Sequence, residues 1–199
     1  MNVVMWAKET LYLKTAQQVL EKNKQDILTL ISRFKLDNQD IGDDFYVLGT
    51  SSLILQDTLA KKHVRDVDIY VEGREIQNKP DEVDIVINDV LPIGWKDRVV
   101  NINGINCVSV FDQACTFGLS YTKKPLREIL MLWLLRDFDL EEVKAAMKQK
   151  LDSGIGVTES DFKHYDKFCK EITQKLIDLN RNPQEKLIEL LEKEETNAE

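Results

Sequence analysis

Two aspartates, Asp66 and Asp68, stand on either side of Val67 at the start of an alternating segment that continues to Val71. This alternation is typical of a half-buried strand, so the two carboxylates are expected on one face and the apolar side chains on the other. Mg²⁺ prefers oxygen ligands, at about 2.1 Å. The Asp66–Asp68 pair is therefore a candidate site for hard divalent cations.

A second polar group, Gly49 to Ser52, lies between the strand-like residues 45–48 and residues 53–62, which have the spacing of an amphipathic helix. These patterns predict a strand–turn–helix junction at Gly49. A glycine there lets the backbone approach a phosphate closely, and the N–H groups and hydroxyls that open the helix can hold the phosphate. Alternatively, Ser51 and Ser52 cap the helix without binding a ligand.

A third carboxylate, Asp84, lies in the β-branched segment 83–87 and could complete the metal site. Asp81, Glu82 and Asp89 are close enough in sequence to take its place. A phosphate cradle beside clustered carboxylates is what metal-assisted nucleotidyl transfer requires. The plainer alternative is that these acids form the solvated face of a sheet.

At these residues the sequence resembles the nucleotidyltransferase superfamily of the polymerase-β type, and within it the AbiEii-like toxins and related bacterial proteins. Gly49-Thr50 occupies the Gly-Ser position of the family pattern, Asp66 and Asp68 its Asp-x-Asp, and Asp84 its third carboxylate. The resemblance covers roughly residues 45–147. A later segment matches the Lys-Asp-x-x-Asp-Ile helix start of such proteins through Lys124, Leu126, Glu128 and Ile129.

The resemblance implies a Mg²⁺-dependent enzyme, with two metal ions and Mn²⁺ as a substitute, that moves a nucleoside monophosphate from an NTP to a hydroxyl of a protein or tRNA. It also implies a place in a toxin–antitoxin or phage-defence system, with a cognate protein partner. Asp66, Asp68 and Asp84 would be both metal ligands and catalytic residues, with Asp84 taking the acceptor proton. The nucleotide-binding residues would be Gly49, Thr50, Ser51, Ser52 and Lys124.

Departures from the family pattern keep other functions open. Thr50 adds a β-branch at a tight turn, and the spacing between Gly49 and Asp66 is longer than expected. One alternative is therefore a catalytically inactive protein of the same fold that binds a nucleotide or a partner. Another is an interaction module whose terminal helices bind a partner, with the carboxylates incidental.

The composition is that of an ordinary globular protein, with 199 residues, 43% hydrophobic and 31% charged. Its net charge of −8 repels nucleic acid at long range, which favours a protein acceptor slightly over tRNA. No apolar run reaches the roughly 18 residues of a membrane span, and residues 1–10 lack the form of a signal peptide, so we expect a cytoplasmic protein that binds no membrane. The basic residues that could offset the charge near the site are Lys61, Lys62, Arg65, Lys123, Lys124 and Arg127.

Three cysteines without CxxC spacing, Cys107, Cys115 and Cys169, fit a reducing compartment, and Cys107 and Cys169 are expected to be small core residues. With His63 and His164 as the only histidines, a zinc site is disfavoured. Any metal should be a hard cation held by carboxylates.

The expected fold is α+β, a nucleotidyltransferase-like mixed sheet with packed helices. We divide the chain into an N-terminal helical segment (1–37), an α/β core (38–120) and a C-terminal helical region (121–199). Asn103-Gly104 predicts a hairpin turn within residues 99–110. Helices are expected at 13–34, around 126–134, after Asp139, at 159–180 and from Pro183.

Overall fold

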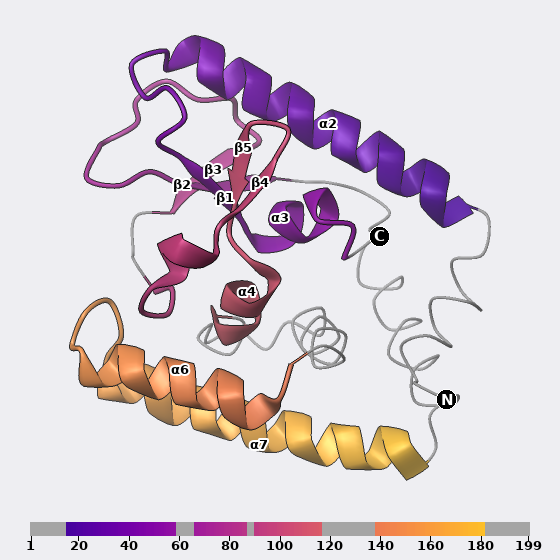
Figure 1. Cartoon of the computed structure of the whole chain (residues 1–199), viewed down its shortest axis with the longest axis vertical. Helices are drawn as coiled ribbons and strands as arrows, with labels where there is room; N and C mark the ends of the chain where they lie inside the picture. The colour runs from indigo at the N-terminus through magenta and orange to yellow at the C-terminus, as the bar shows by residue number, and fades with distance from the viewer. Residues whose placement is uncertain (1–14, 59–65, 87–89, 117–137, 182–199) are drawn as a thin grey trace. The chain divides into compact units, whose positions relative to one another are not determined.

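A computed structural model describes residues 15–58, 66–86, 90–116 and 138–181 (Figure 1). The chain forms two compact units, and each is described by itself. One comprises Lys14–Asp89 with Gly94–Gln113, and the other comprises Met1–Leu13, Val90–Ile93 and Ala114–Glu199. None of the described helices is long and apolar enough for a membrane span.

A five-stranded mixed sheet forms the centre of the first unit, in the order β3-β2-β1-β5-β4. β1 is antiparallel to β2 and parallel to β5, β2 is parallel to β3, and β4 is antiparallel to β5. The α+β class and the mixed sheet expected from the sequence are confirmed. The strands are β1 (Tyr46–Leu48), β2 (Val67–Tyr70), β3 (Val83–Val86), β4 (Val100–Ile102) and β5 (Ile105–Cys107).

One face of this sheet is covered by α2 (Thr15–Asp37) and α3 (Gly49–Leu55), as Figure 1 shows. The apolar stripe of α2 recurs near a 3.6-residue period, so its side chains meet the inward residues of the strands in one core. Because α2 shares this core, it belongs with the sheet. The core includes Ile27, Ile31, Phe34, Val47, Ile54, Leu55, Val67, Ile69, Val83 and Cys107.

The opposite face of the sheet carries an aromatic cluster. Tyr46 and Tyr70 are register partners on β1 and β2, and Trp95 of η1 (Trp95–Arg98) packs edge-on against both rings. Asp68 lies two residues before Tyr70, so alternation places it on this face beside the cluster. The polar residues of β2 therefore point away from the core that α2 covers.

The β4–β5 hairpin turns at Asn103 and Gly104, as predicted. Both residues have positive φ, 52° and 81°, which is the backbone of the tight turns that Asn-Gly favours. Asn101 Oδ1 also accepts a hydrogen bond from the Gly104 N–H at 3.0 Å. Local chemistry is sufficient to set this turn, which is why the sequence predicts it.

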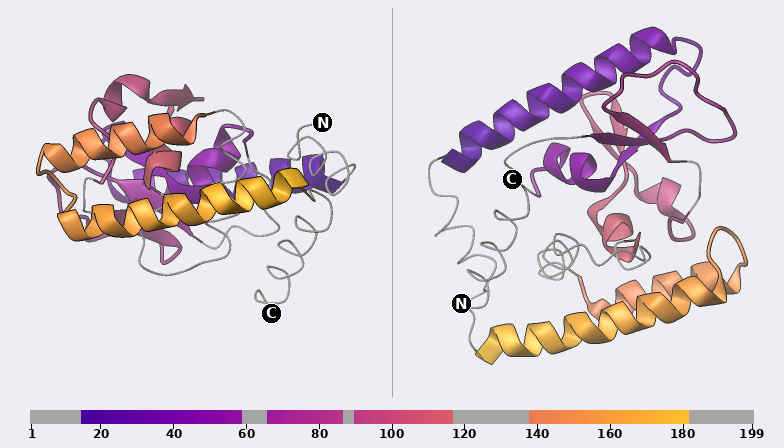
Figure 2. Two further views of the ribbon diagram at one scale, coloured as in Figure 1. Left: turned by 90° about the horizontal axis from the view of Figure 1, so that it is seen from below. Right: turned by 180° about the vertical axis from the view of Figure 1, so that it is seen from behind.

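In the second unit, α6 (Leu140–Asp152) and α7 (Glu159–Arg181) lie side by side (Figures 1 and 2). Asp139 caps α6 by accepting the Glu141 N–H at 2.9 Å. Thr158 and Asp161 form the predicted reciprocal cap of α7, with the Thr158 N–H donating to Asp161 Oδ2 at 2.9 Å. The buried side chains of the pair include Val143, Met147, Tyr165, Cys169 and Ile172.

Two helices differ from the expectation. α3 begins at Gly49 itself rather than at Leu53, and its helical turns end at Leu55. α4 (Val110–Thr116) was not predicted as a separate helix, because its seven residues are too few to show a helical period. The helices expected at 126–134 and from Pro183 lie outside the described residues.

Candidate functional site

Asp68 and Asp84 occupy directly paired positions on the parallel strands β2 and β3. Register partners point to the same face, and neighbouring strands lie about 4.8 Å apart, so both carboxylates can reach one ligand. Asp66 lies two residues before Asp68. The Val67 N–H donates to the Glu82 carbonyl at 2.8 Å, and Asp66 is the residue directly before β2. The sheet thus places Asp68 and Asp84 on one face, with Asp66 next to the start of β2.

The accessibility of these acids suits ligand binding. Asp66 and Asp84 are exposed, whereas Asp68 is half-buried. Among the residues that the structure describes, no three His, Cys, Asp or Glu side chains form a ready-made metal cluster. The sequence predicts that these three carboxylates converge on one metal site, and that cluster is not formed among the described residues. Their oxygen-only chemistry is of the type that Mg²⁺ takes.

Gly49 brings the start of α3 against the Asp68 carboxylate. β1 is antiparallel to β2 with Leu48 paired to Asp68, so the residue after Leu48 emerges beside that side chain. Gly49 has a φ of +65°, and a Cβ added there would lie 2.1 Å from Asp68 Oδ2. Glycine is therefore required twice, by the left-handed backbone and by the close approach.

The two serines of the predicted phosphate cradle are used within the fold. Ser51 Oγ donates to the Asp66 carbonyl at 3.1 Å, and Ser52 Oγ donates to the Val108 carbonyl at 2.7 Å. Both serines are buried. Ser51 therefore joins α3 to the start of β2, and Ser52 joins it to the end of β5. Thr50, between them and Gly49, is half-buried.

Gln113 of α4 is a residue that sequence reasoning missed. Its Oε1 accepts a hydrogen bond from the Gly49 N–H at 3.0 Å, and the side chain is almost fully buried. This N–H, one of the groups expected to hold the phosphate, therefore has a partner within the protein. Gly49 and Gln113 are 64 positions apart, and no local sequence pattern predicts a contact over that separation.

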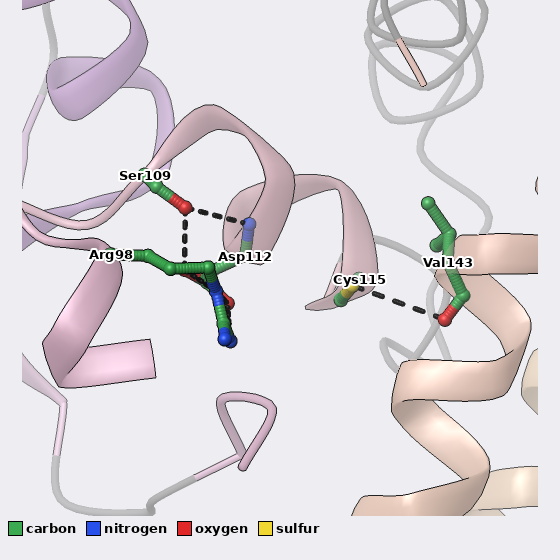
Figure 3. Close-up of polar contacts among 5 residues, drawn as sticks. All are labelled: Arg98, Ser109, Asp112, Cys115 and Val143. Atoms are coloured by element: carbon green, nitrogen blue, oxygen red, sulfur yellow. Dashed lines mark hydrogen bonds and ion pairs between the residues drawn. The ribbon is translucent and has the colours of Figure 1, made fainter. Parts of the chain in front are cut away.

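An ion pair between the partly exposed Arg98 and the fully buried Asp112 holds the start of α4 (Figure 3). Arg98 Nη2 lies 2.6 Å from Asp112 Oδ1, and the Asp112 side chain has no exposed surface. Ser109 Oγ accepts the Asp112 N–H at 3.1 Å and donates to the Asp112 carboxylate. The Ser109-x-x-Asp112 spacing is that of a capping box with Asp in the Glu position. The start of α4 could therefore have been recognised from the sequence.

No family model matches this chain, and no curated protein or solved structure matches it.

The remaining predicted contacts fall on residues outside the described ranges. Lys124, assigned to the triphosphate, lies in the stretch 117–137. Lys61, Lys62 and Arg65 lie in 59–65, and Lys123 and Arg127 lie in 117–137. The described part of the site therefore consists of the three aspartates, the Gly49–Ser52 turn and Gln113.

All three cysteines are buried and none forms a disulfide. Burial raises the pKa of the Cys107 thiol to about 12, and it also raises that of Cys169 to about 12. Both thiols are therefore neutral at physiological pH, so they lack the thiolate that nucleophilic catalysis needs. The expectation that they behave as small core residues is confirmed.

Proposed function

We propose that this protein is a Mg²⁺-dependent nucleotidyltransferase that moves a nucleoside monophosphate from an NTP to a hydroxyl on a protein or tRNA. The observation that carries the proposal is the position of Asp68, which is in register with Asp84 on one side and in contact with Gly49 on the other. A strand-borne pair of carboxylates next to a glycine turn fits a metal-bound triphosphate. The same proposal places the enzyme in the cytoplasm, with a cognate protein partner in a toxin–antitoxin or phage-defence system.

In the proposed reaction the acceptor oxygen bonds to the α-phosphorus of the NTP, and the bond to the bridging oxygen of the β-phosphate breaks. Pyrophosphate leaves, and the proton of the acceptor hydroxyl passes to Asp84. Asp66, Asp68 and Asp84 would hold Mg²⁺, or Mn²⁺ in its place, which when bound offsets the charge of the phosphates. Asp84 is exposed, so an acceptor can approach its carboxylate.

The nucleotide would lie against the Gly49–Ser52 turn, with Lys124 as a further contact to the triphosphate. The buried Ser51 and Ser52 hydroxyls already donate to backbone carbonyls, so their role is to fix the turn. Thr50 has accessible surface and is the hydroxyl of this turn best placed for a phosphate. This assignment is narrower than the one the sequence suggests.

Transfer of label from α-³²P-labelled ATP, CTP, GTP and UTP tests the proposal. With Mg²⁺ and a cell lysate as acceptor source, we expect one nucleotide to label a protein or tRNA band. Asp66→Asn, Asp68→Asn and Asp84→Asn should each abolish labelling, whereas Asp26→Asn on α2 should not. Equal labelling by Asp68→Asn and the wild type would contradict the proposal.

A second candidate function is nucleotide or partner binding without catalysis. It is favoured by the internal partners of the Gly49 N–H and the two serine hydroxyls, which leave fewer groups for the triphosphate. Mg²⁺-dependent NTP binding without label transfer would identify this function. No NTP binding at all would instead favour an interaction module built on the terminal helices.

A further inference from the structure

We infer that Gln113 is a positioning residue, which holds the Gly49 turn in the conformation that meets Asp68. The inference rests on the proposed function for its effect on nucleotide binding, whereas the contact itself can be measured separately. Its basis is the 3.0 Å hydrogen bond from the Gly49 N–H to Gln113 Oε1, made by a side chain that is 1% exposed.

The Gly49 N–H needs an external acceptor, because the first N–H groups of a helix have no partner within it. Leu48 occupies the N-cap position of α3 and supplies no side-chain cap. Gln113 therefore supplies an acceptor to the N–H of the first helical residue, whereas N-cap side chains usually accept from the second or third residue. A cap from a distant helix ties the orientation of the turn to the position of α4.

The orientation of the Leu48–Gly49 peptide matters because Gly49 contacts both Gln113 and Asp68. Gln113 Oε1 binds its N–H, and Asp68 Oδ2 lies where a Cβ would be. Rotation of the Leu48–Gly49 peptide would break the first contact and change the second. The hydrogen bond thus fixes the residue that borders the proposed metal-binding carboxylate.

The ion pair of the buried Asp112, the residue before Gln113, helps to hold the backbone that carries the Gln113 amide. Asp112, the preceding residue, is held by Arg98 of η1 and by the Ser109 hydroxyl. The Gln113 N–H also donates to the Ser109 carbonyl at 3.0 Å. These contacts fix the backbone that carries the amide, and burial of the side chain restricts its rotamers around the hydrogen bond to Gly49.

Gln113→Met tests the inference, since it keeps the length of the side chain and removes the acceptor. The matched control is Gln56→Met, which removes the Gln56 amide that donates to the Val108 carbonyl at 2.8 Å from the far end of α3. Both variants change an amide that anchors α3, but only Gln113 contacts Gly49. Gln113→Glu serves as the rescue, because it restores an acceptor oxygen.

Two measurements apply to each variant. The first is the ¹H–¹⁵N resonance and the hydrogen exchange of the Gly49 amide. The second is the Kd of the protein for ATP, CTP, GTP and UTP, each measured by isothermal titration in the presence of Mg²⁺. In Gln113→Met we expect the Gly49 proton to shift upfield and exchange at least about tenfold faster, and the Kd of the bound nucleotide to rise about tenfold. Gln113→Glu keeps the acceptor and should keep the Gly49 resonance near its wild-type position, and Gln56→Met should leave both measurements near wild type.

An unchanged Gly49 resonance in Gln113→Met would overturn the inference, as would an equal loss of affinity in Gln56→Met. If the wild type binds none of the four nucleotides, the proposed function is wrong. The Gly49 resonance then still decides whether Gln113 positions this turn, so the two failures are distinguishable.

Discussion

The contact between Gly49 and Asp68 joins the backbone turn to the carboxylates of the proposed site. Gly49 needs a left-handed backbone, and its missing side chain leaves the space that Asp68 Oδ2 occupies. These are separate requirements, so substitutions can separate them. Gly73 shares the φ of +65° but has nothing within 4 Å of an added Cβ.

We predict that Gly73→Ala lowers the free energy of unfolding by about 1 kcal/mol, through backbone strain alone. Gly49→Ala should lower it by about 3 kcal/mol, since overpacking adds to the same strain, and should abolish Mg²⁺-dependent nucleotide binding. Urea unfolding of both variants measures the difference. Equal losses in the two variants would show that the Gly49–Asp68 contact is unimportant for stability.

The buried thiol of Cys107 should make the stability of the fold depend on pH. Burial raises the pKa of this thiol to about 12 in the folded chain, against an ordinary value of 9.0. The folded state therefore keeps a proton that the unfolded state releases. The resulting stabilisation is complete below about pH 9 and is lost as the pH rises towards 12.

Denaturant unfolding between pH 8 and 11 checks this prediction. The free energy of unfolding should fall with a slope of up to about 1.4 kcal/mol per pH unit for each buried thiol. Cys107→Ala is less stable at pH 8 because of the cavity that it leaves. Its free energy of unfolding should fall less steeply with pH, by up to about 1.4 kcal/mol per pH unit, because one titrating thiol has been removed. The same slope in both proteins would contradict the prediction.

At the scale of single residues, the sequence predicts the face on which the carboxylates lie and misses what holds the turn. Strand alternation is local, and it places Asp68 on the face opposite to the buried Val67 and Ile69. The pairing of Asp68 with Asp84 depends on a register that the strands settle in three dimensions. Gln113 was missed for the same reason, because its contact with Gly49 is made only after the chain has folded.

Among the elements, α4 is held to η1 by the ion pair between Arg98 and Asp112. Removal of Arg98 leaves a fully buried carboxylate without its charge partner, which is costly. By contrast, Lys96 of the same 3₁₀ helix pairs with exposed Glu72, and such surface pairs contribute little. Lys96 and Arg98 lie in the same four-residue 3₁₀ helix, so their variants compare an exposed ion pair with one that has a buried carboxylate.

We predict that Arg98→Met lowers the free energy of unfolding by about 3 kcal/mol and that Lys96→Met lowers it by less than about 1 kcal/mol. Asp112→Asn should restore part of the stability of Arg98→Met, because it removes the buried charge. Thermal and urea unfolding of the single and double variants would provide the test. A similar effect of both single variants would show that the Arg98–Asp112 pair is not an anchor.

Elements that carry their own start and stop signals are predicted well from this sequence. α2, α7 and the Asn103-Gly104 hairpin agree with expectation within a few residues, because periodicity, caps and turn chemistry are local. α3 and α4 are short, and each depends on contacts made elsewhere in the fold. That dependence is why the start of α3 was misplaced. α4 has a local capping-box start at Ser109 and Asp112, but its seven residues are too few to show a helical period.

For the whole molecule, charge is the property that separates the two proposed acceptors. The net charge of −8 opposes tRNA, which normally requires several Lys or Arg contacts to phosphates. Protein acceptors carry no such requirement. We therefore predict that labelled NTP, incubated with total tRNA and a cell lysate, marks a protein band on a denaturing gel. Label in tRNA alone would overturn this preference.

Mg²⁺-dependent NTP binding by the wild type and Asp68→Asn tests the central claim most directly. We predict that isothermal titration shows binding of at least one NTP by the wild type, that omission of Mg²⁺ abolishes it, and that Asp68→Asn weakens it at least about tenfold. Asp26→Asn, which removes the same charge from the exposed side of α2, should bind as the wild type does. Binding that is independent of Mg²⁺, or that is equal in Asp68→Asn and the wild type, would contradict the assignment of this sheet face as a metal-dependent nucleotide site.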